Sequence, residues 1–413
     1  MILQKREKFR CSIRREALEN HFKLAREKAH QSNSNLQLIQ KYEQLIQANV
    51  IDSDFFEESI LLLESTNDED LIVIILRYIE KFDLSNRSQQ LSDALIKQLN
   101  NTKINSLQFY LIVSITNILS IQDPEIFTQF VSFKLLTSVS EILDSYTELD
   151  IIPNLLECIS CWPYQFIKMN SDQQQLQLLQ SIKGVKQYDQ LNFYKFLIKI
   201  TEEIQNEEYL FTYLIKNKYI QEAIEDFKDD RVYVLDFFIN LSFLEAEQLL
   251  QIISYQFLSP LIFELNKDNK IQGGLYILIR NLLLSNYQIR LYFYDFKIYQ
   301  HLSYGIQYCL DRLDISNLEE ILMCIKSLLQ QDEVSYANTK QQVLSSEIEL
   351  MLQSIFLSLE NQIDIFKLTG EILFIYYTEF KFNGNQQFKE RLKTLDLEVE
   401  IFDSIQSYIE QFD

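Results

Sequence analysis

The sequence predicts an all-α solenoid, a right-handed superhelix of stacked helical repeats, on three observations. The chain has 413 residues, more than the roughly 250 to 300 at which a single hydrophobic core stops growing. It contains only six Gly and four Pro, too few for the turns of a sandwich, a barrel or a doubly wound sheet. A short helical pattern recurs at a fixed spacing, which indicates that the chain adds core by repetition.

The recurring pattern is an Asn followed by a branched apolar residue inside an apolar segment. Asn240 and Asn281 are 41 residues apart, and Asn117 lies 123 residues, or three times 41, before Asn240. This spacing is typical of a three-helix armadillo or two-helix HEAT repeat, and the chain has room for about eight units. The equivalent positions without Asn are Tyr78, Cys161, Lys199, Ser327 and Tyr377.

Two prolines are predicted to mark helix starts. Pro124 follows Asp123, and Pro260 follows Ser259. Asp and Ser are favoured helix caps, and Pro is tolerated in the first turn because its missing N–H has no helical partner there. We therefore expect helices to begin at both prolines.

The charge of the chain is distributed unevenly. Residues 1–30 hold nine Lys or Arg against four Glu, a balance of +5, which leaves −26 on residues 31–413 of a chain whose net charge is −21. Phe9, Ile13 and Ala17 recur at helical spacing, so residues 4–29 are predicted to form one basic amphipathic helix. Such a helix could lie on the protein surface or on a membrane surface, or bind an acidic partner. We expect three parts: the basic helix 1–30, a polar linker 31–35 and a repeat solenoid 36–413.

Composition also limits the class of partner and the location. A net charge of −21 and a pI near 4.7 argue against nucleic-acid binding, which requires a basic surface. The apolar runs are far shorter than the roughly 20 residues of a membrane span. With no signal peptide recognisable, we expect a soluble monomer of the cytoplasm and nucleus.

Catalysis finds little support in the sequence. The three histidines, at positions 21, 30 and 301, are too scattered for a metal site or a His-based triad. No phosphate-binding or HExxH motif occurs. Cys158 and Cys161 have redox spacing, but no strand and glycine-rich turn precede them, so two apolar helix residues are expected. We predict no enzyme, no metal and no cofactor.

Two segments resemble the importin-α family. The run from Ile13 to Arg26, IRREALENHFKLAR, is similar to the second half of its importin-β-binding segment, and Arg6 falls where that family has an upstream arginine. The run from Ile277 to Gln288, ILIRNLLLSNYQ, resembles the third helix and following loop of an importin-α armadillo repeat. The order of a basic segment followed by armadillo-like repeats is also that of the family.

The resemblance implies two binding sites. The residues implied to bind an importin-β-like receptor are Arg6, Arg14, Arg15, Phe22 and Arg26. Those implied to line a groove for a basic nuclear localisation signal are Asn117, Asp236, Asn240 and Asn281. The family carries Trp four residues before each groove Asn, and here those positions are Val113, Asp236 and Ile277, while the one tryptophan, Trp162, lies outside the frame.

Two functional hypotheses follow from these observations. In the first, the chain is a nuclear-import adaptor that binds a basic cargo through the repeats and an importin-β-like receptor through residues 1–30. In the second, it is an armadillo scaffold of a cytoskeletal or ciliary assembly that has lost signal binding. The absent Trp residues favour the scaffold, whereas the retained basic segment favours the adaptor.

Overall fold

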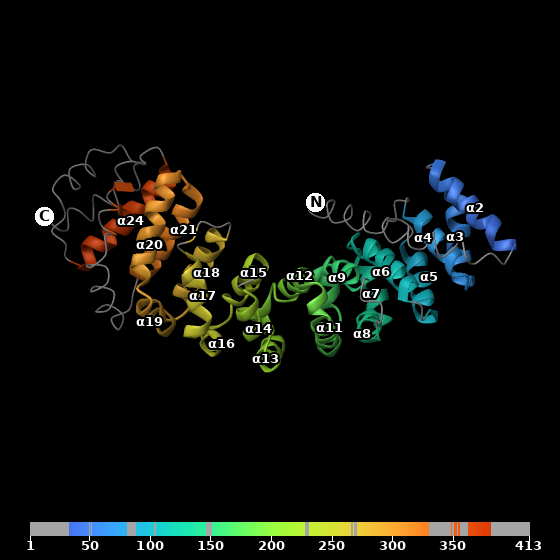
Figure 1. Ribbon diagram of the computed structural model, residues 1–413, viewed down its shortest axis with the longest axis horizontal. Helices are drawn as coiled ribbons and strands as arrows, with labels where there is room; N and C mark the ends of the chain where they lie inside the picture. Colours follow the sequence, from blue (N-terminus) through green and yellow to red (C-terminus); the bar gives the residue numbers. More distant parts are fainter. Residues whose placement is uncertain are drawn as a thin grey trace. The chain divides into compact units, whose positions relative to one another are not determined.

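The computed structural model describes residues 33–48, 52–80, 88–102, 105–145, 151–227, 231–265, 271–329 and 362–380, with a few single residues between these ranges. In this part of the chain all regular structure is helical. The helices stack along the chain as an α-solenoid, which confirms the predicted fold class (Figure 1). Residues 1–30, with the implied receptor-binding residues, lie outside the described residues.

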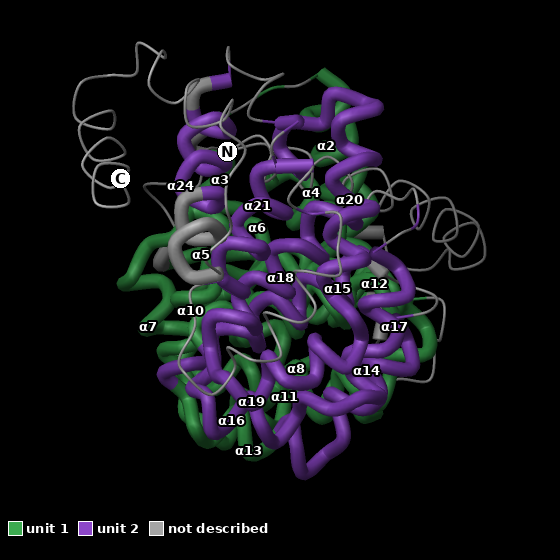
Figure 2. Tube along the Cα trace, turned by 90° about the vertical axis from the view of Figure 1, so that its left-hand side faces the viewer, with its two compact units in different colours: residues 1–203, 207–213 green, residues 204–206, 214–413 purple. Residues whose placement is uncertain are grey.

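The chain divides into two compact units (Figure 2). The first comprises residues 1–203 and 207–213, and the second comprises residues 204–206 and 214–413. The predicted linker 31–35 overlaps the first described helix, because α2 begins at Asn33. Ser and Asn are favoured at helix N-termini as well as in loops, so the polar sequence there fits both structures.

The repeats contain three helices each, as in armadillo proteins. A first helix of five to nine residues precedes two helices of eight to 15 residues. In chain order these triplets are α7 (Pro124–Ser132), α8 (Leu135–Ser145), α9 (Ile152–Ser160); α10 (Tyr164–Lys168), α11 (Asp172–Gly184), α12 (Gln190–Ile200); α13 (Glu208–Lys216), α14 (Tyr219–Asp226), α15 (Arg231–Leu241); α16 (Ala246–Ile252), α17 (Tyr255–Leu265), α18 (Gln272–Ser285); and α19 (Tyr287–Asp295), α20 (Ile298–Arg312), α21 (Ile315–Leu329).

The ends of the described chain continue the same pattern. The N-terminal helices are α2 (Asn33–Ala48), α3 (Ser53–Ser65), α4 (Glu69–Ile79), α5 (Ser88–Asn101) and α6 (Asn105–Leu119), and the last is α24 (Ile363–Phe380). The third helices are α4, α6, α9, α12, α15, α18, α21 and α24. Each packs against the next within its unit: α4 on α6, α6 on α9 and α9 on α12, then α15 on α18, α18 on α21 and α21 on α24.

A shared turn between the first and second helices supports the repeat assignment. Lys134, Lys218 and Lys297 each precede a second helix by one residue, and each has a left-handed backbone with φ between 54° and 60°. Glycine is the usual residue at positive φ, where a side chain costs about 1 kcal/mol. Since the chain is poor in Gly, the repeated turn carries no glycine signal in the sequence.

The helix starts at the two prolines differ. Asp123 caps α7, its side chain accepting from the Glu125 N–H, and Pro124 occupies the first turn, as predicted. The same prediction for Pro260 is wrong, because Pro260 lies inside α17. That helix starts five residues earlier, where the Ser254 hydroxyl accepts from the backbone N–H of Phe257.

Between the helices the core is rich in aromatic side chains. Trp162 is fully buried, and its indole N–H donates to the Thr116 hydroxyl at 2.9 Å. Its ring lies 5.7 Å from that of Phe166 in an edge-to-face arrangement. A buried indole with its N–H satisfied is a stabilising core element.

No single helix among the described residues is long and apolar enough to cross a membrane. By length and composition alone, α7 and α8 pass that test only as a pair, and the pair is bent by 57°.

Candidate peptide-binding face

The third helices carry the predicted groove residues at matching positions. Asn117 lies on α6, Asp236 and Asn240 on α15, and Asn281 on α18. The equivalent positions predicted without Asn fall in the same series: Tyr78 on α4, Cys161 directly after α9, Lys199 on α12, Ser327 on α21 and Tyr377 on α24. The predicted repeat frame therefore falls on or directly after a third helix each time, and we call these eight positions the ladder positions.

Several ladder side chains bind the preceding third helix. Asn281 Nδ2 donates to the Ser242 hydroxyl, just after α15, at 2.9 Å. Lys199 Nζ donates to the Ser160 carbonyl at the end of α9, and Asn117 Nδ2 lies 3.5 Å from Glu80 Oε1, just after α4. These contacts span 37 to 39 residues, about one repeat. At these positions the ladder side chain therefore connects neighbouring repeats.

Ion pairs connect the third helices of the second unit in the same way. Arg280 on α18 lies 2.8 Å from Glu320 on α21, and Lys326 on α21 lies 2.6 Å from Glu371 on α24. All four side chains are half-buried or exposed, so each pair contributes about 1 kcal/mol at most. Carboxylates that are paired within the chain attract a basic peptide less strongly than unpaired ones.

Asp236 is the open carboxylate of this face. Its side chain is exposed, yet the surrounding protein partly desolvates it, and this burial raises the pKa of the carboxyl. Asn240 lies one turn further along α15 and is half-buried. A cation brought to Asp236 would restore favourable interactions to a carboxylate that has lost part of its hydration.

Two exposed apolar side chains, missed by the sequence analysis, lie beside the ladder. Phe243 and Leu284 each follow a ladder Asn by three residues, Leu284 on α18 and Phe243 in the turn directly after α15. They are 41 residues apart in the sequence and are 56% and 59% exposed. The bond from Asn281 to Ser242 brings the end of α15 against α18 beside them. Their common offset from Asn240 and Asn281 was the signal that could have revealed them.

The positions of the missing Trp residues do not form side-chain walls. Val113 is buried in the core, and Ile277 is half-buried. Trp162 is also a core residue and contributes nothing to the surface. We call the surface formed by Asp236, Asn240, Phe243, Asn281 and Leu284 the ladder face. It offers apolar contacts and one open carboxylate.

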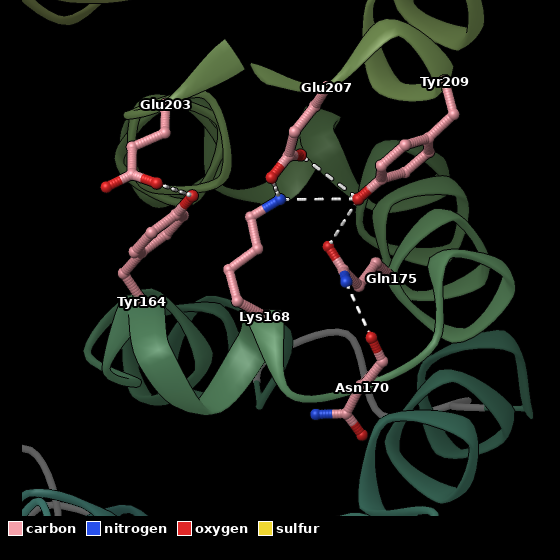
Figure 3. Close-up of polar contacts among 7 residues, drawn as sticks. All are labelled: Tyr164, Lys168, Asn170, Gln175, Glu203, Glu207 and Tyr209. Carbon is pink, nitrogen blue, oxygen red and sulfur yellow. Dashed lines mark hydrogen bonds and ion pairs between the residues drawn. The ribbon is translucent and has the colours of Figure 1, made fainter. Parts of the chain in front are cut away.

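A separate polar cluster connects two repeats in the first unit (Figure 3). Lys168, at the end of α10, forms an ion pair with Glu207 and lies 3.4 Å from the Tyr209 hydroxyl on α13. That hydroxyl lies 3.0 Å from Gln175 Oε1 and 3.1 Å from Glu207 Oε2. Gln175 in turn donates to the Asn170 carbonyl at 2.8 Å.

Burial shifts the pKa values in this cluster. It lowers the pKa of Lys168 and raises the pKa of Tyr209 to about 12. Burial, and then the nearby Glu203 carboxylate at 3.3 Å, raises the pKa of Tyr164. Perturbed groups can mark active sites, but the polar contacts described here join one repeat to its own turn or to the next repeat. The cluster is therefore a structural connection between α10, α11 and α13.

The remaining candidate groups are metal ligands and cysteine thiols. No group of three or more His, Cys, Asp or Glu there could hold a metal. Cys158 is buried in α9, and Cys161 is half-buried at its end. Burial raises the pKa of Cys309 to about 12 and that of Cys324 further still, so neither thiol is a ready nucleophile.

Comparisons with known proteins bear on the fold alone. No protein-family model and no curated protein matches the chain. A crystal structure of an engineered protein is similar over 92% of this chain and 96% of its own, at 13% identity and a TM-score of 0.66. A designed armadillo repeat protein in complex with the peptide (KR)4 matches 69% of this chain and 98% of its own, at 16% identity and a TM-score of 0.35. Computationally designed armadillo repeat proteins for modular peptide recognition match 68% and 98%, at 15% identity and a TM-score of 0.36.

Proposed function

We propose that this chain is a non-enzymatic armadillo-type adaptor that binds an extended segment of a partner protein on its ladder face. The observation that carries the proposal is the repeated pair of an Asn with an exposed apolar residue three positions later. Asn240 with Phe243 and Asn281 with Leu284 repeat the same pairing at the end of two successive third helices, one repeat apart. A regular surface suits an extended peptide, whose side chains also recur at regular intervals.

The chemistry of the ladder face selects the side chains of the partner. Phe243 and Leu284 would bury apolar side chains, and Asp236 would bind one Lys or Arg. A purely basic peptide fits less well, because the neighbouring carboxylates Glu320 and Glu371 are already paired. We therefore expect a partner segment that mixes apolar with basic residues.

Fluorescence anisotropy with the full chain tests this proposal. The probes are a labelled peptide of alternating Lys and Leu, (KL)4, and the basic peptide (KR)4, which a designed armadillo protein binds. We expect (KL)4 to bind more tightly. The double variant Phe243→Ala, Leu284→Ala should weaken (KL)4 binding about tenfold, as for the loss of two interface anchors.

A matched control uses an exposed aromatic residue outside the ladder face. Tyr304 on α20 is 69% exposed, so Tyr304→Ala removes a side chain of similar size and exposure to Phe243. It should leave the affinity unchanged. Equal binding of (KL)4 by the wild type and the double variant, or tighter binding of (KR)4, would contradict the proposal.

A more specific form of this proposal is that the chain is a nuclear-import adaptor, and the basic residues 1–30 favour it. In that form Arg6, Arg14, Arg15, Phe22 and Arg26 bind an importin-β-like receptor, and the ladder face binds a basic cargo in the cytoplasm for release in the nucleus. A pull-down of residues 1–35 with importin-β tests it. Charge reversal at Arg14 and Arg15 should abolish the interaction, and an interaction that survives the reversal rejects the import role. A scaffold role would then remain.

A further inference from the structure

The second unit has a groove away from the ladder face, between the second helices α14 and α17. It has a volume of about 830 Å³, within the roughly 300 to 1,000 Å³ typical of ligand sites. Its apolar lining consists of Ile224, Phe227, Tyr255, Pro260, Phe263 and Phe296. Four of them are aromatic and one is proline, whereas Ile224 is the one aliphatic side chain among these lining residues.

Two of the four aromatic rings are presented to solvent, whereas Phe227 is buried and Phe296 is half-buried. Phe263 is 68% exposed and Tyr255 is 50% exposed. Tyr255 is held in place by Asp295, which accepts a hydrogen bond from its hydroxyl, and by the rings of Tyr292 at 5.2 Å and Phe296 at 5.5 Å. An exposed aromatic ring fixed by its neighbours loses little entropy on binding, so it is well suited as a binding platform.

The groove also offers acceptors for a positively charged donor. The Glu225 carboxylate is exposed at its edge, while Glu264 is paired with Lys267 at 2.7 Å. Pro260 has no N–H, so the Gln256 carbonyl, four residues earlier in α17, does not receive its usual helical bond. The ammonium of Lys267 lies 3.8 Å from the Phe263 ring centre, which shows that this ring accepts a cation.

We propose that this groove binds an extended, proline-rich segment of a partner protein that carries an arginine. A left-handed polyproline helix docks into aromatic-lined grooves at low entropic cost, because its extended conformation is already formed before binding. The arginine fits the remaining charge, because its donors match the Glu225 carboxylate and the Gln256 carbonyl. This site is separate in its residues from the ladder face, so it does not depend on the proposed function.

Anisotropy titrations of the full chain test the site with a labelled peptide of sequence RPLPPLP. Three comparison peptides isolate its features: RGLGGLG removes the prolines, EPLPPLP reverses the charge, and an amphipathic Lys–Leu helix replaces the extended conformation. We expect RPLPPLP to bind with a Kd below about 1 mM, a weak but specific interaction. Each comparison peptide should bind at least about fivefold more weakly, the effect of losing one good contact.

Variants of exposed side chains assign the binding to the groove. Phe263→Ala and Glu225→Lys should each weaken RPLPPLP binding about fivefold or more, and because both side chains are exposed, the fold should persist. Tyr304→Ala is the matched control for Phe263→Ala. The double variant Phe243→Ala, Leu284→Ala is a second control, and neither control should change the affinity for RPLPPLP. The proposal is overturned if RPLPPLP does not bind at concentrations up to about 1 mM. It is also overturned if any of the three comparison peptides binds as tightly as RPLPPLP, or if either groove variant binds RPLPPLP as tightly as the wild type does.

Discussion

The hydroxyl of Tyr209 provides a direct test of how neighbouring repeats of the first unit are held together. Tyr209→Phe removes the group that lies 3.0 Å from Gln175 and 3.1 Å from Glu207. Gln175 is only 2% exposed, so water cannot easily replace the lost donor. Leaving a buried acceptor without its partner costs about 1 to 3 kcal/mol.

The same helix offers a matched control. Tyr213, one turn further along α13, lies 3.5 Å from Gln180 Oε1 in an exposed contact. This pair spans 33 residues, against 34 for Tyr209 and Gln175, but its contact is longer and exposed to solvent. Tyr213→Phe should therefore change the free energy of unfolding by less than about 0.5 kcal/mol, as is usual at the surface.

Urea unfolding followed by tryptophan fluorescence measures both variants. Trp162 is the one tryptophan in the chain, and its ring lies 5.7 Å from Phe166 on α10, the helix that also carries Lys168. With a slope of about 2 kcal/mol per molar urea, a loss of 2 kcal/mol lowers the midpoint by about 1 M. The reasoning is refuted if Tyr209→Phe unfolds at the wild-type midpoint, or if Tyr213→Phe is destabilised as much as Tyr209→Phe.

Two further predictions concern stability. Asn281→Ala removes the 2.9 Å hydrogen bond to Ser242 and should lower the free energy of unfolding by about 1 kcal/mol. Urea unfolding followed by circular dichroism measures this loss. A variant as stable as the wild type would show that this bond does not stabilise the contact between the two repeats. Burial raises the pKa of Tyr42 and of Tyr209 to about 12 from an ordinary value of 10, so above pH 10 the unfolded chain loses these protons before the folded chain does. Stability should be fully present below pH 10 and fall as the pH rises toward 12. Thermal melts at increasing pH measure this fall, which should be shallower in Tyr42→Phe, and an unchanged slope in that variant would contradict the assignment.

The sequence by itself determined the fold class and the repeat frame. Scarcity of Gly and Pro excluded sheet architectures, and the spacing of Asn117, Asn240 and Asn281 placed each of these three residues on a third helix. This was possible because a repeat must bury the same face in each unit, so its apolar and polar positions recur in the sequence. The Asp123–Pro124 helix start was predictable for a similar reason, since a cap acts on residues within one turn.

Only the tertiary structure decided what those positions do. The sequence could not show that Asn281 bonds Ser242, that Lys199 reaches the end of α9, or that Phe243 and Leu284 are exposed. Nor could it show that α17 starts at Tyr255 and encloses Pro260 beside a groove. These facts depend on which helix packs against which side chain about 40 residues away, and contacts at that distance leave no local pattern. Recurrence along a chain identifies equivalent positions, and the neighbouring repeat determines whether each one stabilises the stack or remains free to bind a partner.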